Sequence, residues 1–127
     1  MRRILLVDDD AEIRDVIRLL LEDAGFTVVE AVDGDAAMVA FRAQPTDLLI
    51  CDLFMPGQDG VQVINALHRE FPQVKIIAIS GGAYRGTLDM LPVIKFLGAD
   101  EVLRKPVDGT QLLVAVRRLL GLPAETA

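Results

Sequence analysis

Short apolar runs recur along the chain at lengths typical of β-strands. They occupy residues 4–7, 26–31, 48–52, 75–80 and 102–103. The run Leu48-Leu49-Ile50-Cys51 contains no polar residue, which is typical of a strand buried on both faces. The pattern therefore predicts five strands.

A segment with apolar residues at intervals of three and four follows each strand. In the first such segment Ile13, Ile17 and Leu21 recur at helical spacing, whereas Arg14 and Glu22 lie on the other face. Five helices are predicted in this way, at residues 13–24, 36–44, 61–71, 90–97 and 109–120. Capping residues support the ends: Asp33 and Asp108 before helices, and Gly25, Gly98 and Gly121 after them.

The order of these elements predicts the fold class. Strands that alternate strictly with helices form a parallel sheet with right-handed crossovers and helices on both faces. No linker, repeat or low-complexity segment interrupts the 127 residues, a length typical of one domain. We expect a single doubly wound α/β domain of the (βα)5 type.

Composition narrows the functional classes. The net charge of −6 argues against general nucleic-acid binding, and no apolar run is long enough to span a membrane. The single cysteine, Cys51, forms no internal disulfide, which favours the cytoplasm. The run at 4–7 is too short for a signal peptide, and Met1-Arg2-Arg3 suggests a natural start.

Polar residues lie at the ends of four of the predicted strands or just beyond them. They are Asp8, Asp9 and Asp10, then Asp52, Ser80 and Lys105. In a parallel sheet the carboxyl ends of the strands share one edge, where ligands bind in open α/β sheets. Neighbouring carboxylates repel, and Mg²⁺ suits a site that offers one or two carboxylates and a phosphate. Acids, a hydroxyl and a lysine in one place indicate phosphoryl transfer to a carboxylate.

Four motifs in order resemble the receiver domain of two-component response regulators. Val7-Asp8-Asp9-Asp10 resembles the family's acidic pair, and the segment Asp52-Leu53-Phe54-Met55-Pro56-Gly57-Gln58-Asp59-Gly60 resembles the phosphoacceptor region. Ser80 matches the family's Ser/Thr switch, and Lys105-Pro106 matches its lysine followed by a proline that is commonly cis. The resemblance implies a flavodoxin-like sheet of order 2-1-3-4-5, with residues 1–122 as the receiver domain and 123–127 as a short tail.

The resemblance also implies a role for each site residue. Asp52 would take a phosphoryl group from a histidine kinase or a small acyl phosphate. Asp9, Asp52 and the main-chain carbonyl of Phe54 would bind Mg²⁺, with Mn²⁺ as a substitute, and Asp8 would act through water. Lys105 would pair with the phosphoryl oxygens, and Ser80 would turn towards them. A domain of this kind also removes its own phosphoryl group with Mg²⁺, so it is a timed switch rather than a conventional turnover enzyme.

The implied output is protein–protein contact. The face formed by the predicted helix at 90–97, the strand at 102–103 and the last helix would change on phosphorylation. The expected phosphoryl donor is a sensor histidine kinase or a phosphotransfer protein. The expected output partner is a downstream protein or an effector domain, and a dimer that forms on phosphorylation is also compatible with the resemblance. Two features depart from the family pattern. Val102 stands where an aromatic is usual, and the glycine-rich stretch 81–86 adds a loop beside the site.

Two alternatives compete with this reading. A degenerate receiver would act only as a binding module, although all the expected polar residues are present. A haloacid dehalogenase-type phosphatase would use Asp8 and Asp10 in D-x-D-x-[TV], but Glu12 replaces the last residue of that motif. A nucleotide site is disfavoured because Gly81-Gly82 lacks both common phosphate-loop patterns. We expect Asp10 to cap the first helix, Cys51 to be buried and His68 to lie at the surface.

Overall fold

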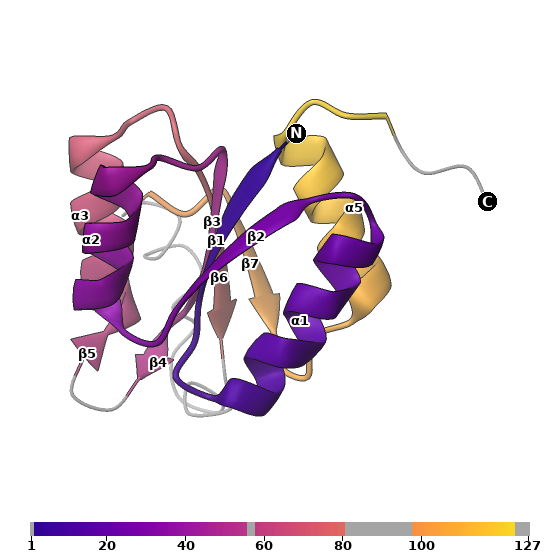
Figure 1. Cartoon of the computed structure of the whole chain (residues 1–127), viewed down its shortest axis with the longest axis horizontal. Helices are drawn as coiled ribbons and strands as arrows, with labels where there is room; N and C mark the ends of the chain where they lie inside the picture. The colour runs from indigo at the N-terminus through magenta and orange to yellow at the C-terminus, as the bar shows by residue number, and fades with distance from the viewer. Residues whose placement is uncertain (1, 56–57, 81–97, 124–127) are drawn as a thin grey trace.

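The computed structural model describes residues 2–55, 58–80 and 98–123. Within those residues the elements follow in this order: β1 (Arg3–Val7), α1 (Ala11–Asp23), β2 (Thr27–Ala31), α2 (Gly34–Ala43), β3 (Leu48–Asp52), β4 (Phe54–Met55), β5 (Gln58–Asp59), α3 (Gly60–Glu70), β6 (Lys75–Ser80), β7 (Glu101–Arg104) and α5 (Gly109–Leu119). The chain is traced in Figure 1.

Five of the strands form one parallel sheet in the order β2-β1-β3-β6-β7. This confirms the predicted fold class and the 2-1-3-4-5 order. The central strand β3 is buried at all five positions, as its uninterrupted apolar run predicts. The strand that was predicted at 102–103 extends by one residue at each end, because Glu101 and Arg104 continue the pairing with β6.

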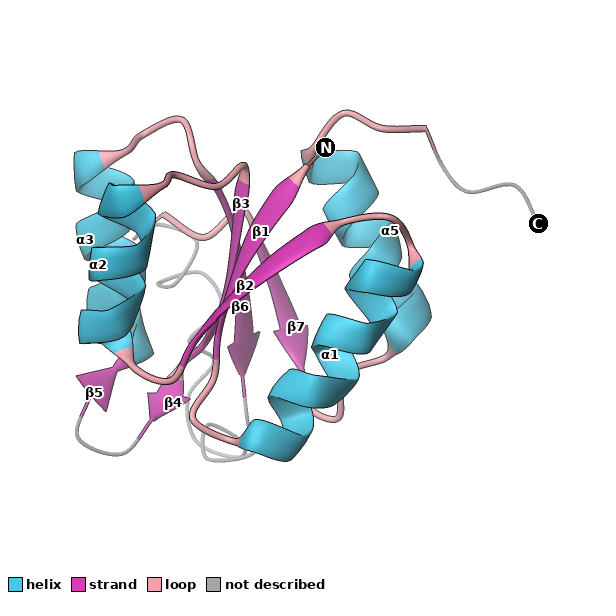
Figure 2. Ribbon diagram, in the orientation of Figure 1, coloured by secondary structure: helices cyan, strands magenta, loops and turns pink. Residues whose placement is uncertain are grey.

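The helices cover both faces of this sheet, with α1 and α5 on one side and α2 and α3 on the other (Figure 2). Because successive strand residues point to opposite faces, Leu5 and Leu49 belong to the core beneath α2 and α3. Ile4 and Ile50 belong to the core beneath α1 and α5. The sheet is therefore sealed on both faces and meets solvent mainly at its edges and strand ends.

Side chains and glycines set the helix ends as the sequence predicts. The carboxylates of Asp10, Asp33 and Asp108 each accept hydrogen bonds from the first backbone amides of the helices that follow them. Gly25, after α1, has a positive φ of 99°, a conformation that favours glycine. The caps at Asp10 and Asp108 fix where α1 begins after β1 and where α5 begins after β7.

A small antiparallel pair, β4 with β5, follows β3 and was not predicted. The sequence pattern indicated only a turn at Pro56-Gly57, which lies outside the described residues. The predicted helix at 90–97 and the glycine-rich stretch 81–86 lie outside them as well. In Figure 1 the β4–β5 pair lies at the same end of the molecule as the arrowheads of β6 and β7.

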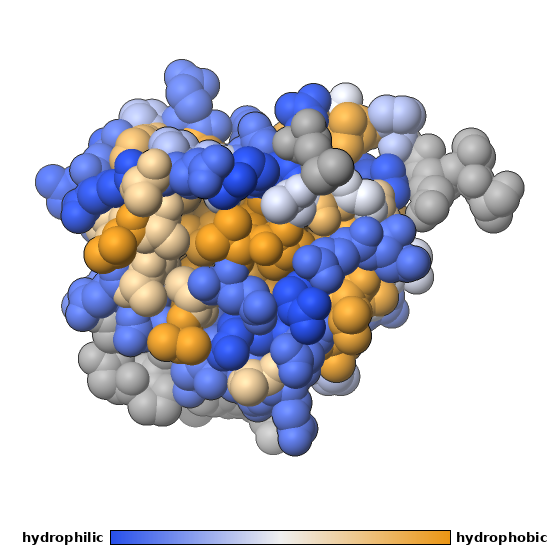
Figure 3. All heavy atoms as spheres, viewed as in Figure 1, coloured by the Kyte–Doolittle hydropathy of each residue, from blue (hydrophilic) through white to orange (hydrophobic). Residues whose placement is uncertain are grey.

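The edge strand β2 forms part of an apolar area of the surface. In Figure 3 an apolar band crosses the middle of the visible face, where Figure 1 shows β2 between α1 and α2. Val28 and Val29 of this strand are only partly buried. Among the described residues, no helix combines the length and the apolar character needed to cross a membrane.

Candidate functional site

The register of the sheet brings the polar strand ends together. Val7 pairs with Cys51, so Asp8 and Asp52 are the next residues on neighbouring strands. Asp52 pairs with Ile79, so Ser80 is one residue further along β6. Ser80 in turn pairs with Arg104, which precedes Lys105. The carboxyl-terminal edge of the sheet thus brings together residues from four neighbouring strands, β1, β3, β6 and β7.

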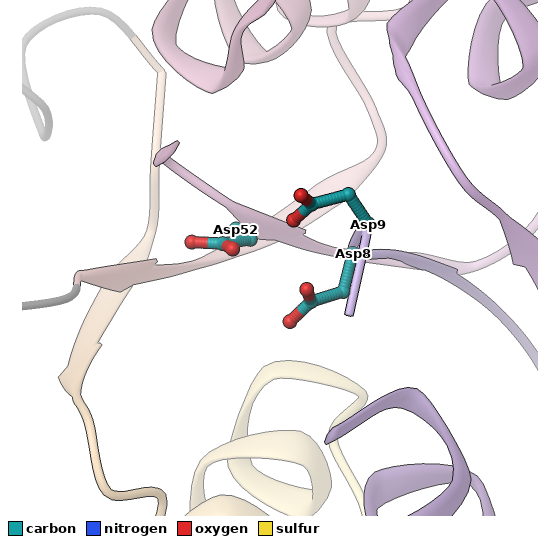
Figure 4. A group of neighbouring side chains, drawn as sticks. All are labelled: Asp8, Asp9 and Asp52. Atoms are coloured by element: carbon teal, nitrogen blue, oxygen red, sulfur yellow. The ribbon is translucent and has the colours of Figure 1, made fainter. Parts of the chain in front are cut away.

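Three carboxylates converge at this edge. Oxygens of Asp8, Asp9 and Asp52 all lie within 4.8 Å of one another. Figure 4 shows Asp8 and Asp9 projecting from the chain after β1 towards Asp52 at the end of β3. Asp8 and Asp52 are each only 1% exposed, whereas Asp9 is exposed. The cluster is therefore buried on its strand side and open to solvent on the side of Asp9.

Backbone contacts hold Asp8 in the cluster and turn Asp10 away from it. The amide of Asp8 donates to the carbonyl of Ala31 at 3.2 Å, which continues the pairing with β2. Asp8 Oδ1 accepts the Asp10 amide at 2.9 Å, while Asp10 Oδ1 accepts the amides of Glu12 and Ile13. The carboxylate of Asp10 is thus committed to capping α1, as predicted. This argues against the D-x-D phosphatase reading, which needs both aspartates in the site.

Lys105 supplies the positive charge. Its Nζ donates to Asp52 Oδ2 at 3.0 Å and lies 3.8 Å from Asp8 Oδ2. The peptide bond from Lys105 to Pro106 is cis, as the resemblance implied. Burial opposes the charge of Lys105, but the hydrogen bond and the attraction of Asp52, with the attraction of Asp8 and Asp9, outweigh it. The pKa of Lys105 is therefore raised above its usual 10.5.

Asp8 is the carboxyl of the cluster whose pKa is raised by its surroundings. Burial is the main cause that raises the pKa of Asp8 from 3.8 to about 6, and the charges of Asp52 and Asp9 add to it. The Asp10 amide and Lys105 oppose this shift. Asp8 Oδ2 is buried and accepts no hydrogen bond from the residues that the structure describes. A buried acceptor beside two further carboxylates fits a hard divalent cation.

Gly60 holds the segment after Asp52 against the site. Its amide donates to the carbonyl of Leu53 at 3.2 Å. A Cβ at Gly60 would lie 2.1 Å from the carbonyl oxygen of Asp52 and 2.7 Å from Cα of Leu53. Both are backbone atoms that cannot turn aside, so only glycine fits. The close approach folds β4 and β5 back beside the end of β3.

Comparison with known proteins identifies the family. Residues 4–117 match the response regulator receiver domain family. The chain belongs to this family. Among relatives it is 37% identical over 121 residues to the transcriptional regulatory protein CpxR of Escherichia coli, with 94% of this chain and 50% of that protein covered. It is 36% identical over 119 residues to the transcriptional regulatory protein CseB of Streptomyces avermitilis, with 92% and 48% covered.

Solved receiver domains share the fold. A CheY-like receiver domain protein from Methanospirillum hungatei matches with a TM-score of 0.86 at 27% identity, covering 95% of this chain and 94% of that one. A receiver domain protein from Clostridium thermocellum matches with a TM-score of 0.86 at 28% identity, covering 95% of each. The receiver domain described here spans about half the length of the curated relatives named above.

The receiver fold brings together most of the predicted site residues. Asp8, Asp9, Asp52 and Lys105 form one cluster. Ser80 is 4% exposed and occupies the same edge by register. Phe54 lies in β4, two residues beyond Asp52. The sequence pattern does not predict the steric demand at Gly60. Its position in the quoted phosphoacceptor region was the only signal for it, since a close backbone approach leaves no periodicity.

Three further residues, Cys51, Val102 and His68, lie outside the acidic cluster. Cys51 is buried, as predicted, with its Sγ 3.4 Å from the Asp52 carbonyl. Val102 is partly buried and packs against the core beneath α2 and α3. His68 is half-buried rather than fully at the surface, because it packs closely against Gly98, where a Cβ would lie 2.6 Å from the imidazole.

Proposed function

We propose that this receiver domain accepts a phosphoryl group on Asp52 and later loses it by hydrolysis. The phosphorylated and unphosphorylated forms would differ at the output face, and the domain would signal through that difference. The observation that carries the proposal is the environment of Asp52. Its carboxylate is buried, is hydrogen-bonded to Lys105, and lies within 4.8 Å of the carboxylates of Asp8 and Asp9. A buried carboxylate beside a lysine and two further acids is a nucleophile with a built-in site for a charged phosphoryl group.

The step at Asp52 is an in-line displacement at phosphorus. A carboxylate oxygen of Asp52 forms a bond to the phosphorus of a phosphohistidine, and the P–N bond breaks. The electron pair leaves with the imidazole nitrogen, which is then protonated by solvent. Lys105, already 3.0 Å from Asp52 Oδ2, pairs with the transferred oxygens. In the return step water attacks the phosphorus and loses a proton to solvent, the bond between phosphorus and the Asp52 oxygen breaks, and inorganic phosphate leaves as the carboxylate of Asp52 is restored.

The acidic cluster fits Mg²⁺, with Mn²⁺ as a substitute. Asp9, Asp52 and the main-chain carbonyl of Phe54 would hold the ion directly, and Asp8 would hold it through water. When bound, the ion neutralises the carboxylates and the phosphoryl oxygens. The buried Asp8 Oδ2, which accepts no hydrogen bond within the described residues, supports this ligand set.

Ser80 and the output surface complete the proposal. Ser80 would turn its hydroxyl to the new phosphoryl group, which adds a charge of about −1 at Asp52. The change would pass to the face formed by β7, α5 and the segment predicted as the helix at 90–97. The donor would be a sensor histidine kinase or phosphotransfer protein in the cytoplasm. Because CpxR and CseB are named as transcriptional regulators, the receiver of a longer relative would act on an effector domain.

Intact mass spectrometry after incubation with acetyl phosphate and Mg²⁺ tests the site. The wild type should gain one phosphoryl group, and Asp52→Asn should gain none. Asp10→Asn is the matched control, because Asn also caps helices and the Asp10 carboxylate points away from the cluster. An adduct that persists in Asp52→Asn would refute the assignment. A wild type that is unmodified by acetyl phosphate and by partner kinases would favour the pure binding module.

A further inference from the structure

Arg14, on α1, reaches back to the loop that follows β1, which consists of Asp8, Asp9 and Asp10 and is called the acidic loop below. Its Nη1 donates to the main-chain carbonyl of Asp8 at 2.8 Å, and its Nε donates to Glu30 Oε1 at 3.2 Å. The side chain of Arg14 is only 15% exposed. Removing a charged side chain from water to this extent is unfavourable unless hydrogen bonds and an ion pair compensate for it. The bonds of Arg14 to Asp8 and Glu30 provide this compensation.

The carbonyl that Arg14 binds belongs to the peptide group between Asp8 and Asp9. That peptide is planar, and the amide of Asp8 is already held by Ala31. Binding the carbonyl as well fixes the orientation of the link between Asp8 and Asp9. Because both peptide groups that flank Asp8 are held, its side chain leaves the backbone in a fixed direction, and the Cα atom of Asp9 has a fixed position. Arg14 therefore bears on the placement of both carboxylates without touching either of them.

The guanidinium suits this task because its donors have a fixed planar arrangement. One edge meets a carbonyl of the acidic loop, and Nε meets a carboxylate on β2. Glu30 on β2 thereby anchors Arg14, with its own side chain 33% exposed. The acidic loop, α1 and β2 are tied together at one point beside the site.

We propose that Arg14 is a positioning residue for the cation site of this receiver, anchored by Glu30; the inference rests on the proposed function. It is not a ligand and does not touch the phosphoryl group. Its loss releases the peptide between Asp8 and Asp9, so the two carboxylates no longer present the same geometry to the ion. Removing an outer partner that orients metal ligands typically weakens metal affinity by about 10–100-fold.

Arg18 offers a matched control one turn further along α1. It forms ion pairs with Glu30 at 3.4 Å, Glu22 at 3.0 Å and Asp15 at 3.5 Å, all carboxylates on α1 and β2. Arg18→Gln therefore removes the same charge from the same network and leaves the bond to the Asp8 carbonyl in place. Comparing it with Arg14→Gln separates positioning from charge.

The test measures Mg²⁺ affinity by calorimetry and unfolding by urea without Mg²⁺. Arg14→Gln should weaken Mg²⁺ binding about tenfold or more, in line with outer-shell changes elsewhere, and Glu30→Gln should weaken it less. Arg18→Gln should leave it nearly unchanged, and Arg14→Lys should recover part of the loss. In the metal-free protein, the amide NMR shifts of Asp9 and Asp10 should move in Arg14→Gln and stay in place in Arg18→Gln.

The outcomes separate the two claims. If the wild type binds Mg²⁺ but Arg14→Gln binds it as well as Arg18→Gln does, the positioning role is wrong. A loss of unfolding free energy without a loss of Mg²⁺ affinity would show that Arg14 is only structural, which also overturns the proposal. If the wild type itself fails to bind Mg²⁺, the proposed cation site is wrong, and the positioning role of Arg14, which depends on that site, is wrong as well.

Discussion

Asp8 is the residue at which burial and charge conflict most directly. Its side chain is 1% exposed, and one of its oxygens accepts no hydrogen bond among the described residues. Lys105 approaches that oxygen to 3.8 Å but donates its hydrogen bond to Asp52. On the proposal that the cluster holds a cation, this conflict is an expected cost, because carboxylates that repel one another without the ion attract it when it binds.

Replacing Asp8 by Asn should stabilise the metal-free protein at neutral pH. A carboxyl whose folded pKa is raised from 3.8 to about 6 destabilises the fold increasingly as pH rises through that window. Below about pH 3 the group is protonated in both folded and unfolded states, and the penalty disappears. The shift corresponds to at most about 3 kcal/mol at pH 7.5. Urea unfolding of both proteins at about pH 3 and pH 7.5 measures it.

Saturating Mg²⁺ should reverse the order of these two proteins, because the ion stabilises only the fold that binds it. Asp23→Asn, a change at an exposed position at the end of α1, is the control for adding an amide. An Asp8→Asn protein less stable than wild type at pH 7.5 without metal would contradict the electrostatic account.

Most elements could be predicted because their periodicity is long enough to detect. The strands of the main sheet, the caps at Asp10 and Asp108, and the shared edge all follow from apolar runs and turn residues. The β4–β5 pair could not be predicted, since two-residue strands carry no period. The helical spacing predicts only that Arg14 lies on the polar face of α1. Only the fold reveals that its long side chain reaches the Asp8 carbonyl.

Gly60→Ala should displace the β4–β5 pair and weaken the site. The new Cβ would lie 2.1 Å from the Asp52 carbonyl oxygen, a contact that neither backbone segment can relieve locally. We expect a loss of about 1–3 kcal/mol or more in unfolding free energy, as for other overpacked positions. Phosphorylation by acetyl phosphate should also slow. Urea unfolding and the rate of phosphoprotein formation measure the two effects.

Gly25→Ala is the matched comparison for this change. Gly25 has a φ of 99° and no atom within 4 Å of its Cβ position, so alanine there strains only the backbone, by about 1–2 kcal/mol. Its phosphorylation rate should equal that of the wild type. Equal rates for Gly60→Ala and Gly25→Ala would show that the close approach at Gly60 has no part in the site.

At the scale of the whole molecule, two hydrophobic cores share a single sheet. Alternate residues of β1 and β3 enter opposite cores, so neither core can form without the strands that also build the other. We propose that residues 1–122 are one cooperative domain, with 123–127 as a tail. The acidic edge lies where β1 and β3 end, and its geometry therefore depends on both cores.

Mild truncations on the two sides should shift one common unfolding transition. Ile64→Val lies in the core beneath α2 and α3, and Ile17→Val in the core beneath α1 and α5. Each should cost about 0.5–1.5 kcal/mol, with the dependence on urea unchanged. Circular dichroism and a probe attached near either core should report the same midpoint. Two separate transitions, or a reduced urea dependence in one variant, would contradict a single domain.

The arrangement of three carboxylates around one lysine implies a reciprocal relation between ion and signal. Ionised, these four groups leave a formal charge of −2. Phosphorylation of Asp52 would make the cluster more negative, so the ion should be held more tightly afterwards. By thermodynamic linkage, the factor by which phosphorylation favours the ion equals the factor by which the ion favours phosphorylation. The free Mg²⁺ of the compartment would then be an effector of this receiver in its own right.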